Sequence, residues 1–202
     1  MSRPLLERAM EKIREKDMEV YLVDSPAAAR EKVMEIVKAG PVALSGSRYI
    51  KDLSLKECLE SRGIESWVAD RDYAPADAAA GDAGRPRGVL AGKLAGAAYG
   101  ITGATAIAGD TGSVVIMEDR GNDHIISALP SVHIVIAGTE SVVPSMTEAM
   151  ALCRKISQEE LNKPLGRHIS IISGPSATSD IQGALVKGMT GPLEVYVILI
   201  AS

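Results

Sequence analysis

The residues best suited to bind a ligand lie in a loop of small polar side chains at residues 173–180. This loop follows an apolar segment and precedes an expected turn or helix, so its backbone N–H groups could hold an anion such as phosphate or carboxylate. The glycine patterns of Walker and dinucleotide-binding loops are absent from the chain. The same composition also suits an ordinary strand-to-helix turn that a hydroxyl caps. The candidate anion-binding residues are Gly174, Pro175, Ser176, Thr178 and Asp180.

Asp110 is the best candidate for catalysis, because it is the one acidic residue in the apolar segment 88–117. A carboxylate in such surroundings must be hydrogen-bonded, face solvent at a strand end, or have a shifted pKa. It could act as a general base or nucleophile. Alternatively, Asp110 sits at a hairpin turn and caps the residues that follow it. The flanking candidates for substrate or anion binding are Thr102, Gly103, Thr111 and Gly112.

The histidines and cysteines do not have the spacing of metal ligands. His124, His133 and His168 are never three or four residues apart, and two cysteines cannot complete a zinc or iron–sulfur site. We expect His133 to be a hydrogen-bonded residue of a sheet, and Cys58 and Cys153 to fill the core. The sequence therefore predicts no metal and no other cofactor in this chain.

The composition excludes several classes of protein. The 202 residues are 46% hydrophobic and 24% charged, which predicts one soluble globular core. Only 3% are aromatic, and 26 acidic against 22 basic residues give a net charge of −4, which disfavours nucleic-acid binding. Residues 1–18 carry charges throughout, and no run of 18 apolar residues is typical of a membrane span. We therefore expect a cytoplasmic protein with no nucleic-acid partner and no membrane span.

The elements that must position these residues alternate between strand and helix in the first part of the chain. Helical spacing over residues 4–16 predicts an amphipathic helix whose apolar face needs a partner. Strands are expected at residues 20–23, 42–44 and 64–68, with helices from Ser25-Pro26 to about Lys38 and near residues 53–61. This alternation favours an α/β fold, a mainly parallel sheet flanked by helices. We divide the chain into an N-terminal helix at residues 1–17 and a single α/β domain at residues 18–202.

The rest of the chain adds a loop and further strands. Residues 70–87 have little periodicity and predict a loop or a flap. A helix at residues 90–99 is expected next, and then a hairpin of two strands whose five-residue connection contains two glycines. A later helix opens at Pro144-Ser145, and the strand count suits one open sheet. The remaining expected strands cover residues 104–107, 113–117, 132–137, 169–172 and 193–200.

Three segments of the second half carry a family resemblance. They are ITGATAIA at residues 101–108 with DTGSVV at 110–115, SALPSVHIVI at 127–136, and SGPSATSDI at 173–181 followed by Val186, Gly188, Gly191 and Pro192. In this order and spacing they resemble the signatures of the LUD domain family of lactate-utilisation proteins. The chain differs from the family pattern at Asp110, Gln182 and Thr190, where members often have Glu, Glu and His.

The resemblance implies a Rossmann-like fold related to sugar-phosphate isomerases and CoA transferases, with ligands bound at loops beyond the strand ends. It also implies a role in oxidising L-lactate to pyruvate, beside iron–sulfur partner subunits of LUD type. Without cluster-binding cysteines, this chain would match the small, cofactor-free member of such a system.

Two other functions remain open on the sequence alone. The chain could be a stand-alone enzyme for a small anionic substrate, such as a sugar phosphate or an acyl-CoA, with Asp110 as base and the 173–180 loop as anion site. It could also be a non-catalytic module that docks through the helix at residues 4–16, on a partner or on a second copy as a homo-oligomer.

Overall fold

A sheet of six parallel strands forms the centre of the computed structural model, which describes residues 2–69, 92–118, 122–159, 168–179, 185–187 and 191–201. In spatial order the strands are β1 (Glu19–Val23), β12 (Glu194–Ile200), β7 (Val132–Gly138), β4 (Tyr99–Gly103), β2 (Val42–Leu44) and β3 (Ser66–Val68). The predicted α/β fold with a mainly parallel sheet is therefore confirmed. Because all six strands run in one direction, their carboxyl ends lie along one edge, which we call the carboxyl edge.

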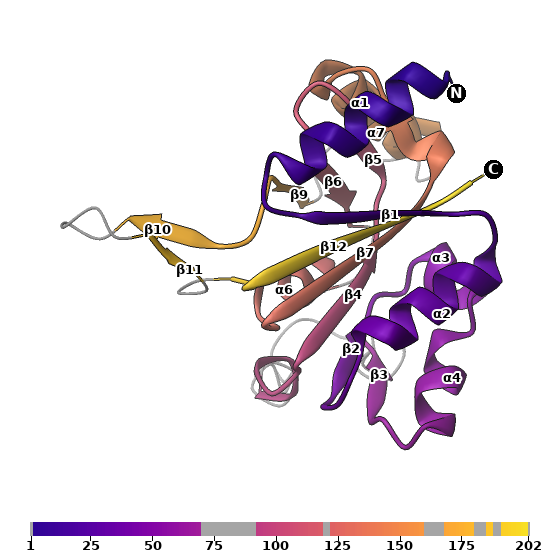
Figure 1. Ribbon diagram of the computed structural model, residues 1–202, viewed down its shortest axis with the longest axis vertical. Coiled ribbons are helices and arrows are strands. Elements are labelled where there is room, and N and C mark those ends of the chain that lie inside the picture. The colour runs from indigo at the N-terminus through magenta and orange to yellow at the C-terminus, as the bar shows by residue number, and fades with distance from the viewer. Residues whose placement is uncertain are drawn as a thin grey trace.

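A second, smaller sheet shows that the expectation of one open sheet was wrong. It contains β8 (Val142–Val143), β5 (Ala106–Ala108), β6 (Val114–Met117) and β9 (Ile169–Ile172), with β5 and β6 paired as the expected antiparallel hairpin. The strand expected at residues 104–107 is β5, which begins two residues later at Ala106, whereas β4, which ends at Gly103 in the large sheet, was not expected. A third pair, β10 (Ala177–Ser179) with β11 (Leu185–Lys187), extends away from both sheets (Figure 1).

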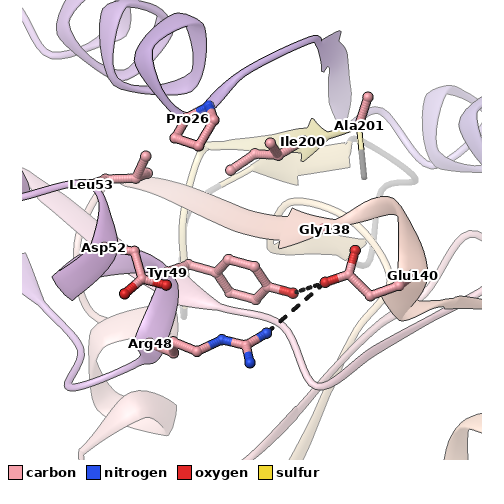
Figure 2. A pocket seen from close by; sticks show the side chains of 9 residues that line it. All are labelled: Pro26, Arg48, Tyr49, Asp52, Leu53, Gly138, Glu140, Ile200 and Ala201. Atoms are coloured by element: carbon pink, nitrogen blue, oxygen red, sulfur yellow. Dashed lines mark hydrogen bonds and ion pairs between the residues drawn. The ribbon is translucent and has the colours of Figure 1, made fainter.

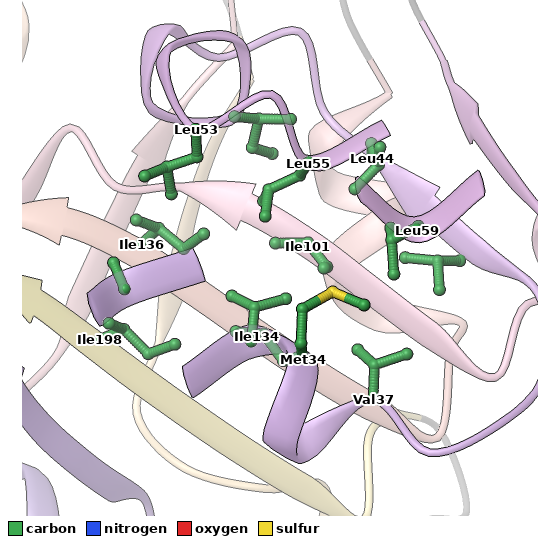
Figure 3. Packing of buried hydrophobic residues seen from close by; sticks show 14 of the residues in the cluster. Met34, Val37, Leu44, Leu53, Leu55, Leu59, Ile101, Ile134, Ile136 and Ile198 are labelled. Carbon is green, nitrogen blue, oxygen red and sulfur yellow. The ribbon is translucent and has the colours of Figure 1, made fainter. Parts of the chain in front are cut away.

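Three helices cover one face of the large sheet, namely α2 (Pro26–Ile36), α3 (Arg48–Asp52) and α4 (Leu55–Ser61) (Figure 1). Met34 and Val37 from this layer pack against Ile101, Ile134 and Ile198 of the strands (Figure 3). Strands β7 and β12 are buried on both faces, as parallel strands between two layers must be. This apolar layer holds the helices that border the carboxyl edge.

The opposite face of the large sheet is covered by α1 (Arg3–Arg14) and the small sheet, whose outer side packs on α7 (Met146–Glu159). Ala9 and Ile13 of α1 are fully buried against Val135, Val197 and their neighbours. The apolar face of the predicted amphipathic helix thus finds its partner within this chain. Among the described residues, no helix is long and apolar enough to cross a bilayer.

Local sequence explains several element boundaries. The Ser25 hydroxyl accepts a hydrogen bond from the Ala28 N–H, so this residue caps α2 as predicted. The helix expected near residues 53–61 is α4 and begins two residues later, at Leu55, because Ser54 adopts a left-handed conformation (φ 48°) that separates α4 from α3. Gly100 lets α6 (Asp123–Ala128) approach β4 closely, since a Cβ there would lie 2.0 Å from the Ile126 carbonyl oxygen.

Three further expectations about secondary structure have different outcomes. Of the helix expected at residues 90–99, the described residues 92–95 are helical, and Tyr99 already belongs to β4. Within the 173–180 loop, Ala177–Ser179 form strand β10, and residues 181–184, where a turn or helix was expected, lie outside the described residues. The predicted flap at residues 70–87 lies outside the described residues.

Candidate functional site

A pocket of about 280 Å³ opens at the carboxyl edge of the large sheet, where α/β folds commonly bind ligands. We call it the edge pocket. Gly138 and Ile200 bring the ends of β7 and β12 to it, Pro26 brings the start of α2, and α3 forms a side wall (Figure 2). The lining residues are Pro26, Arg48, Tyr49, Asp52, Leu53, Gly138, Glu140, Ile200 and Ala201.

One side of the edge pocket is polar and contains charges of both signs. The Tyr49 hydroxyl donates a hydrogen bond to Glu140 Oε1 at 2.9 Å and lies 3.3 Å from the Ser141 hydroxyl (Figure 2). Arg48 lies 4.0 Å from the same carboxylate oxygen and 5.4 Å from the centre of the Tyr49 ring. The Arg48 side chain is 74% exposed, so this ion pair is weak and the guanidinium is accessible to a ligand.

The position of the Glu140 carboxylate depends on Gly138, two residues earlier in the chain. A Cβ at Gly138 would lie 2.0 Å from Glu140 Oε2, so the carboxylate occupies the space that a side chain would take. The backbone of Gly138 is extended (φ −77°, ψ 155°), a conformation that other residues also adopt. A side chain at position 138 would therefore displace the Glu140 carboxylate, the end of a flexible side chain, and would not strain the backbone.

Two predicted binding residues, Thr102 and Gly103, lie at the end of β4 on the same edge. A Cβ at Gly103 would lie 2.8 Å from the Ser47 side chain and 3.4 Å from the Tyr49 ring, so Gly103 packs behind the polar wall. Thr102 points to the other face and is fully buried, with its hydroxyl 2.8 Å from His133 Nε2. The pocket lining therefore contains neither residue, and their assignment to ligand binding stays a prediction.

His133 is buried in the sheet, as expected. Burial lowers the pKa of its imidazole to about 3, which keeps the ring neutral at physiological pH. Its Nδ1 atom has no hydrogen-bond partner among the described residues, so only one of the two ring nitrogens is satisfied. The expected hydrogen bonding of this sheet histidine is therefore present at Nε2 but not at Nδ1.

Asp110 has a clear structural contact in the turn between β5 and β6. Its Oδ1 accepts a hydrogen bond from the backbone N–H of Met146 at 3.1 Å, the first residue of α7. A carboxylate is favourable at a helix N-terminus because of the exposed N–H groups there. Asp110 therefore sits in a turn, as one reading predicted, but its contact is with a distant helix. A catalytic role for it stays a prediction.

The other candidates around this turn lie beside the C-terminal end of α1. Gly112 has a positive φ (70°), and a Cβ there would lie 2.4 Å from the Lys12 backbone. Gly174 also has a positive φ (134°), and a Cβ there would lie 2.7 Å from the Lys16 carbonyl oxygen. The Thr111 hydroxyl accepts a hydrogen bond from the Ser113 N–H within the turn.

The structure brings the two signature loops, residues 109–113 and 173–176, into contact with each other. Ser113 and Ser173 share a hydrogen bond of 2.7 Å between their hydroxyls, and the Ser176 N–H donates to the Pro192 carbonyl at 2.8 Å. Pro175 lies in the same loop and is half-buried. The side chain of Thr178 and all of Asp180 lie outside the described residues. Anion binding by this loop stays a prediction.

The remaining histidines meet in space although they are far apart in sequence. The rings of His124 and His168 lie 4.7 Å apart, and His124 Nδ1 lies 2.7 Å from the carboxylate of Glu118. Within the described ranges, no cluster of three or more His, Cys, Asp or Glu could hold a metal ion. Cys153 is buried and Cys58 is half-buried against the core, where we expected both.

Sequence reasoning missed the polar residues of the edge pocket, namely Arg48, Tyr49, Asp52 and Glu140. A usable signal was present, because Glu140 is the first charged residue after a buried strand that ends at Gly138. Arg48 likewise follows strand β2 and its Ser-Gly-Ser connection. Polar residues just beyond the ends of parallel strands meet at one edge, so the topology would have grouped them.

Comparison with known proteins gives a family match along nearly the whole chain. The LUD domain family matches residues 6–200. Lactate utilization protein C of Anoxybacillus flavithermus is 24% identical over 183 residues, covering 89% of this chain and 73% of that protein. The protein of the same name from Bacillus subtilis is 28% identical over 178 residues, covering 86% and 68%.

Lactate utilization protein B of Bacillus velezensis is 34% identical over 97 residues, which is 48% of this chain. That alignment spans only 20% of the B protein, so about half of this chain matches a fifth of the B protein's length.

A solved structure supports the fold. The crystal structure of a DUF162 family protein from Deinococcus radiodurans superimposes with a TM-score of 0.66 at 16% identity, over 99% of both chains. At that identity the likeness concerns the fold alone. The family match over residues 6–200 agrees with the three sequence signatures, and the chain belongs to the LUD domain family.

Proposed function

We propose that this protein is a component of an L-lactate utilisation system, in which L-lactate is oxidised to pyruvate. The observation that carries the proposal is the family match over residues 6–200, together with alignment to lactate utilization protein C along 80–89% of the chain. Relatives with that name exceed this chain in length only moderately, whereas the B proteins are more than twice as long.

Electron transfer is assigned to partner subunits in this proposal. Cys58 and Cys153 are too few to bind an iron–sulfur cluster, and Cys153 is buried in the core. A B-type LUD protein and an iron–sulfur protein are therefore the proposed partners, and the cytoplasm is the proposed location. The edge pocket supports a role in holding a small metabolite, because about 280 Å³ is less than drug-sized ligands commonly occupy.

The test is reconstitution of lactate oxidation from purified components. The full chain, a B-type partner and the iron–sulfur partner are mixed with L-lactate, and reduction of an artificial electron acceptor is followed by absorbance. We expect omission of this chain to lower the rate at least about tenfold, and the partners to co-purify with it from cells.

The control replaces this chain with the heat-denatured protein at equal concentration. Lactate oxidation at an unchanged rate without this chain would contradict the proposal. Turnover of a sugar phosphate or an acyl-CoA by this chain without its partners would favour the stand-alone enzyme instead.

A further inference from the structure

We propose that the edge pocket binds a short 2-hydroxycarboxylate, with the ligand carboxylate on Arg48 and the ligand hydroxyl donating to Glu140. This inference deepens the proposed function and rests on it for the choice of ligands to test. The polar and apolar residues of the pocket carry it as follows.

Arg48 provides the carboxylate end of the site. A guanidinium presents paired N–H groups that match the two oxygens of a carboxylate. Within the described residues, the only ion pair of Arg48 is the 4.0 Å contact with Glu140, which leaves N–H groups available.

Glu140 selects for a ligand that also carries a hydrogen-bond donor. An ionised carboxylate only accepts hydrogen bonds, and the Tyr49 hydroxyl satisfies Oε1 alone. Among the described residues, no donor is bonded to Oε2 at this position. A hydroxyl on the ligand can donate to this oxygen, whereas a keto oxygen would place two acceptors against each other. The pocket is therefore better suited to a hydroxy acid than to the matching keto acid.

The opposite wall sets the size of the ligand. Pro26, Leu53 and Ile200 face the polar side across the pocket and offer apolar surface for a methyl group or short alkyl chain (Figure 2). A cavity of about 280 Å³ accommodates a molecule of a few carbons and is too small to enclose an acyl-CoA.

Binding to the full chain tests the proposal, by calorimetry with L-lactate, pyruvate, propionate and L-alanine. We expect L-lactate to bind at least about tenfold more tightly than pyruvate or propionate, which lack the donor. L-alanine carries an ammonium group in place of the hydroxyl, so tighter binding of L-alanine would overturn the hydroxyl assignment. Absence of binding by all four compounds would overturn the site.

Three variants separate the two ends of the site. Arg48→Gln should weaken every carboxylate at least about tenfold. Glu140→Gln and Gly138→Ala should reduce L-lactate affinity to about that of propionate, the first by removing the charge and the second by displacing the carboxylate. The matched controls Arg154→Gln, Glu31→Gln and Gly92→Ala lie on exposed positions, and Gly92 has open space around it. Wild-type affinity in Arg48→Gln or Gly138→Ala would contradict the assignment.

The reconstituted system distinguishes this proposal from the proposed function. If Arg48→Gln supports lactate oxidation at the wild-type rate, the pocket assignment fails while the function stands. If lactate binds the pocket and the partners oxidise lactate without this chain, the function fails while the binding site stands.

Discussion

Two regions of this protein contain glycines for opposite structural reasons. Gly112 and Gly174 lie in the signature loops, have positive φ angles, and contact the backbone of residues 12–16 at the C-terminal end of α1. Gly138 lies at the carboxyl edge, has an ordinary extended backbone, and makes room for a carboxylate side chain. In the first group glycine holds two parts of the fold together, and in the second it positions a chemical group. A small residue in a motif therefore does not by itself indicate a ligand.

Gly112→Ala should break the first region and give the largest effect on stability. The substitution forces a left-handed residue and places a methyl group against the Lys12 backbone, so we expect a loss of roughly 2–5 kcal/mol. Thermal denaturation would show a Tm lower by about 5–15 °C.

Calorimetry should meanwhile show unchanged lactate affinity per folded molecule of Gly112→Ala. Gly138→Ala should behave in the opposite way, with lower affinity and a Tm close to the wild type. If both variants lost affinity at unchanged stability, the contrast between the regions would disappear.

Low pH should lower the free energy of unfolding of this protein through His133, which is buried in the large sheet. The pKa of this imidazole is about 3 in the folded state and 6.5 in a model peptide, so the unfolded chain binds the extra proton between these values. Its contribution to stability is complete above pH 6.5 and falls as the pH drops toward 3, by up to about 1.4 kcal/mol per pH unit. Chemical denaturation of wild type and His133→Gln from pH 7 to 4 measures the difference, which should shrink as the pH falls. Parallel curves for the two proteins would contradict it.

Substitution of Asp110 should give the smallest of the predicted changes in stability. Because its carboxylate accepts from the Met146 N–H at the start of α7, Asp110→Ala should cost about 1 kcal/mol, and Asp110→Asn less. Urea denaturation of the three proteins gives these values. A structural role also predicts that the Asn variant keeps lactate oxidation in the reconstituted system. A fall of about two orders of magnitude with Asn would instead support the catalytic role predicted from the sequence.

Regular patterns made most of the large sheet predictable. Strand β2 has the expected bounds, α2 begins at the expected Ser25-Pro26 cap, and β7 and β12 differ from expectation by only a residue at an end. Strand propensity was misleading where one apolar segment contributes to both sheets. Residues 99–108 look like one continuous segment in the sequence, but the chain passes from the large sheet to the small sheet after Gly103. Nothing in the local pattern marks that change, which depends on how β5 pairs with β6 and β8.

The candidate site was less predictable than the fold for a physical reason. The signature loops stand out in sequence because glycines cluster there, and the contacts with residues 12–16 that require those glycines are made by a remote helix. Glu140 and Arg48 stand out less, because single charged residues after strands are common. Their significance comes from strand order, which brings the ends of β7, β12 and β2 near one another only in the folded sheet.

The position of β12 has a consequence for how the protein folds. This strand lies between β1 and β7, so the chain must be synthesised to about residue 200 before β1 can pair with β12, its neighbour among the described strands. Contacts between such distant segments slow folding, because the intervening chain loses its freedom before the pairing energy is gained. Ile200 also lines the edge pocket. Before β12 is in place, β1 and β7 have unpaired backbone groups and the edge pocket lacks Ile200 and Ala201, so a ligand bound in this pocket would report that β12 has joined the sheet.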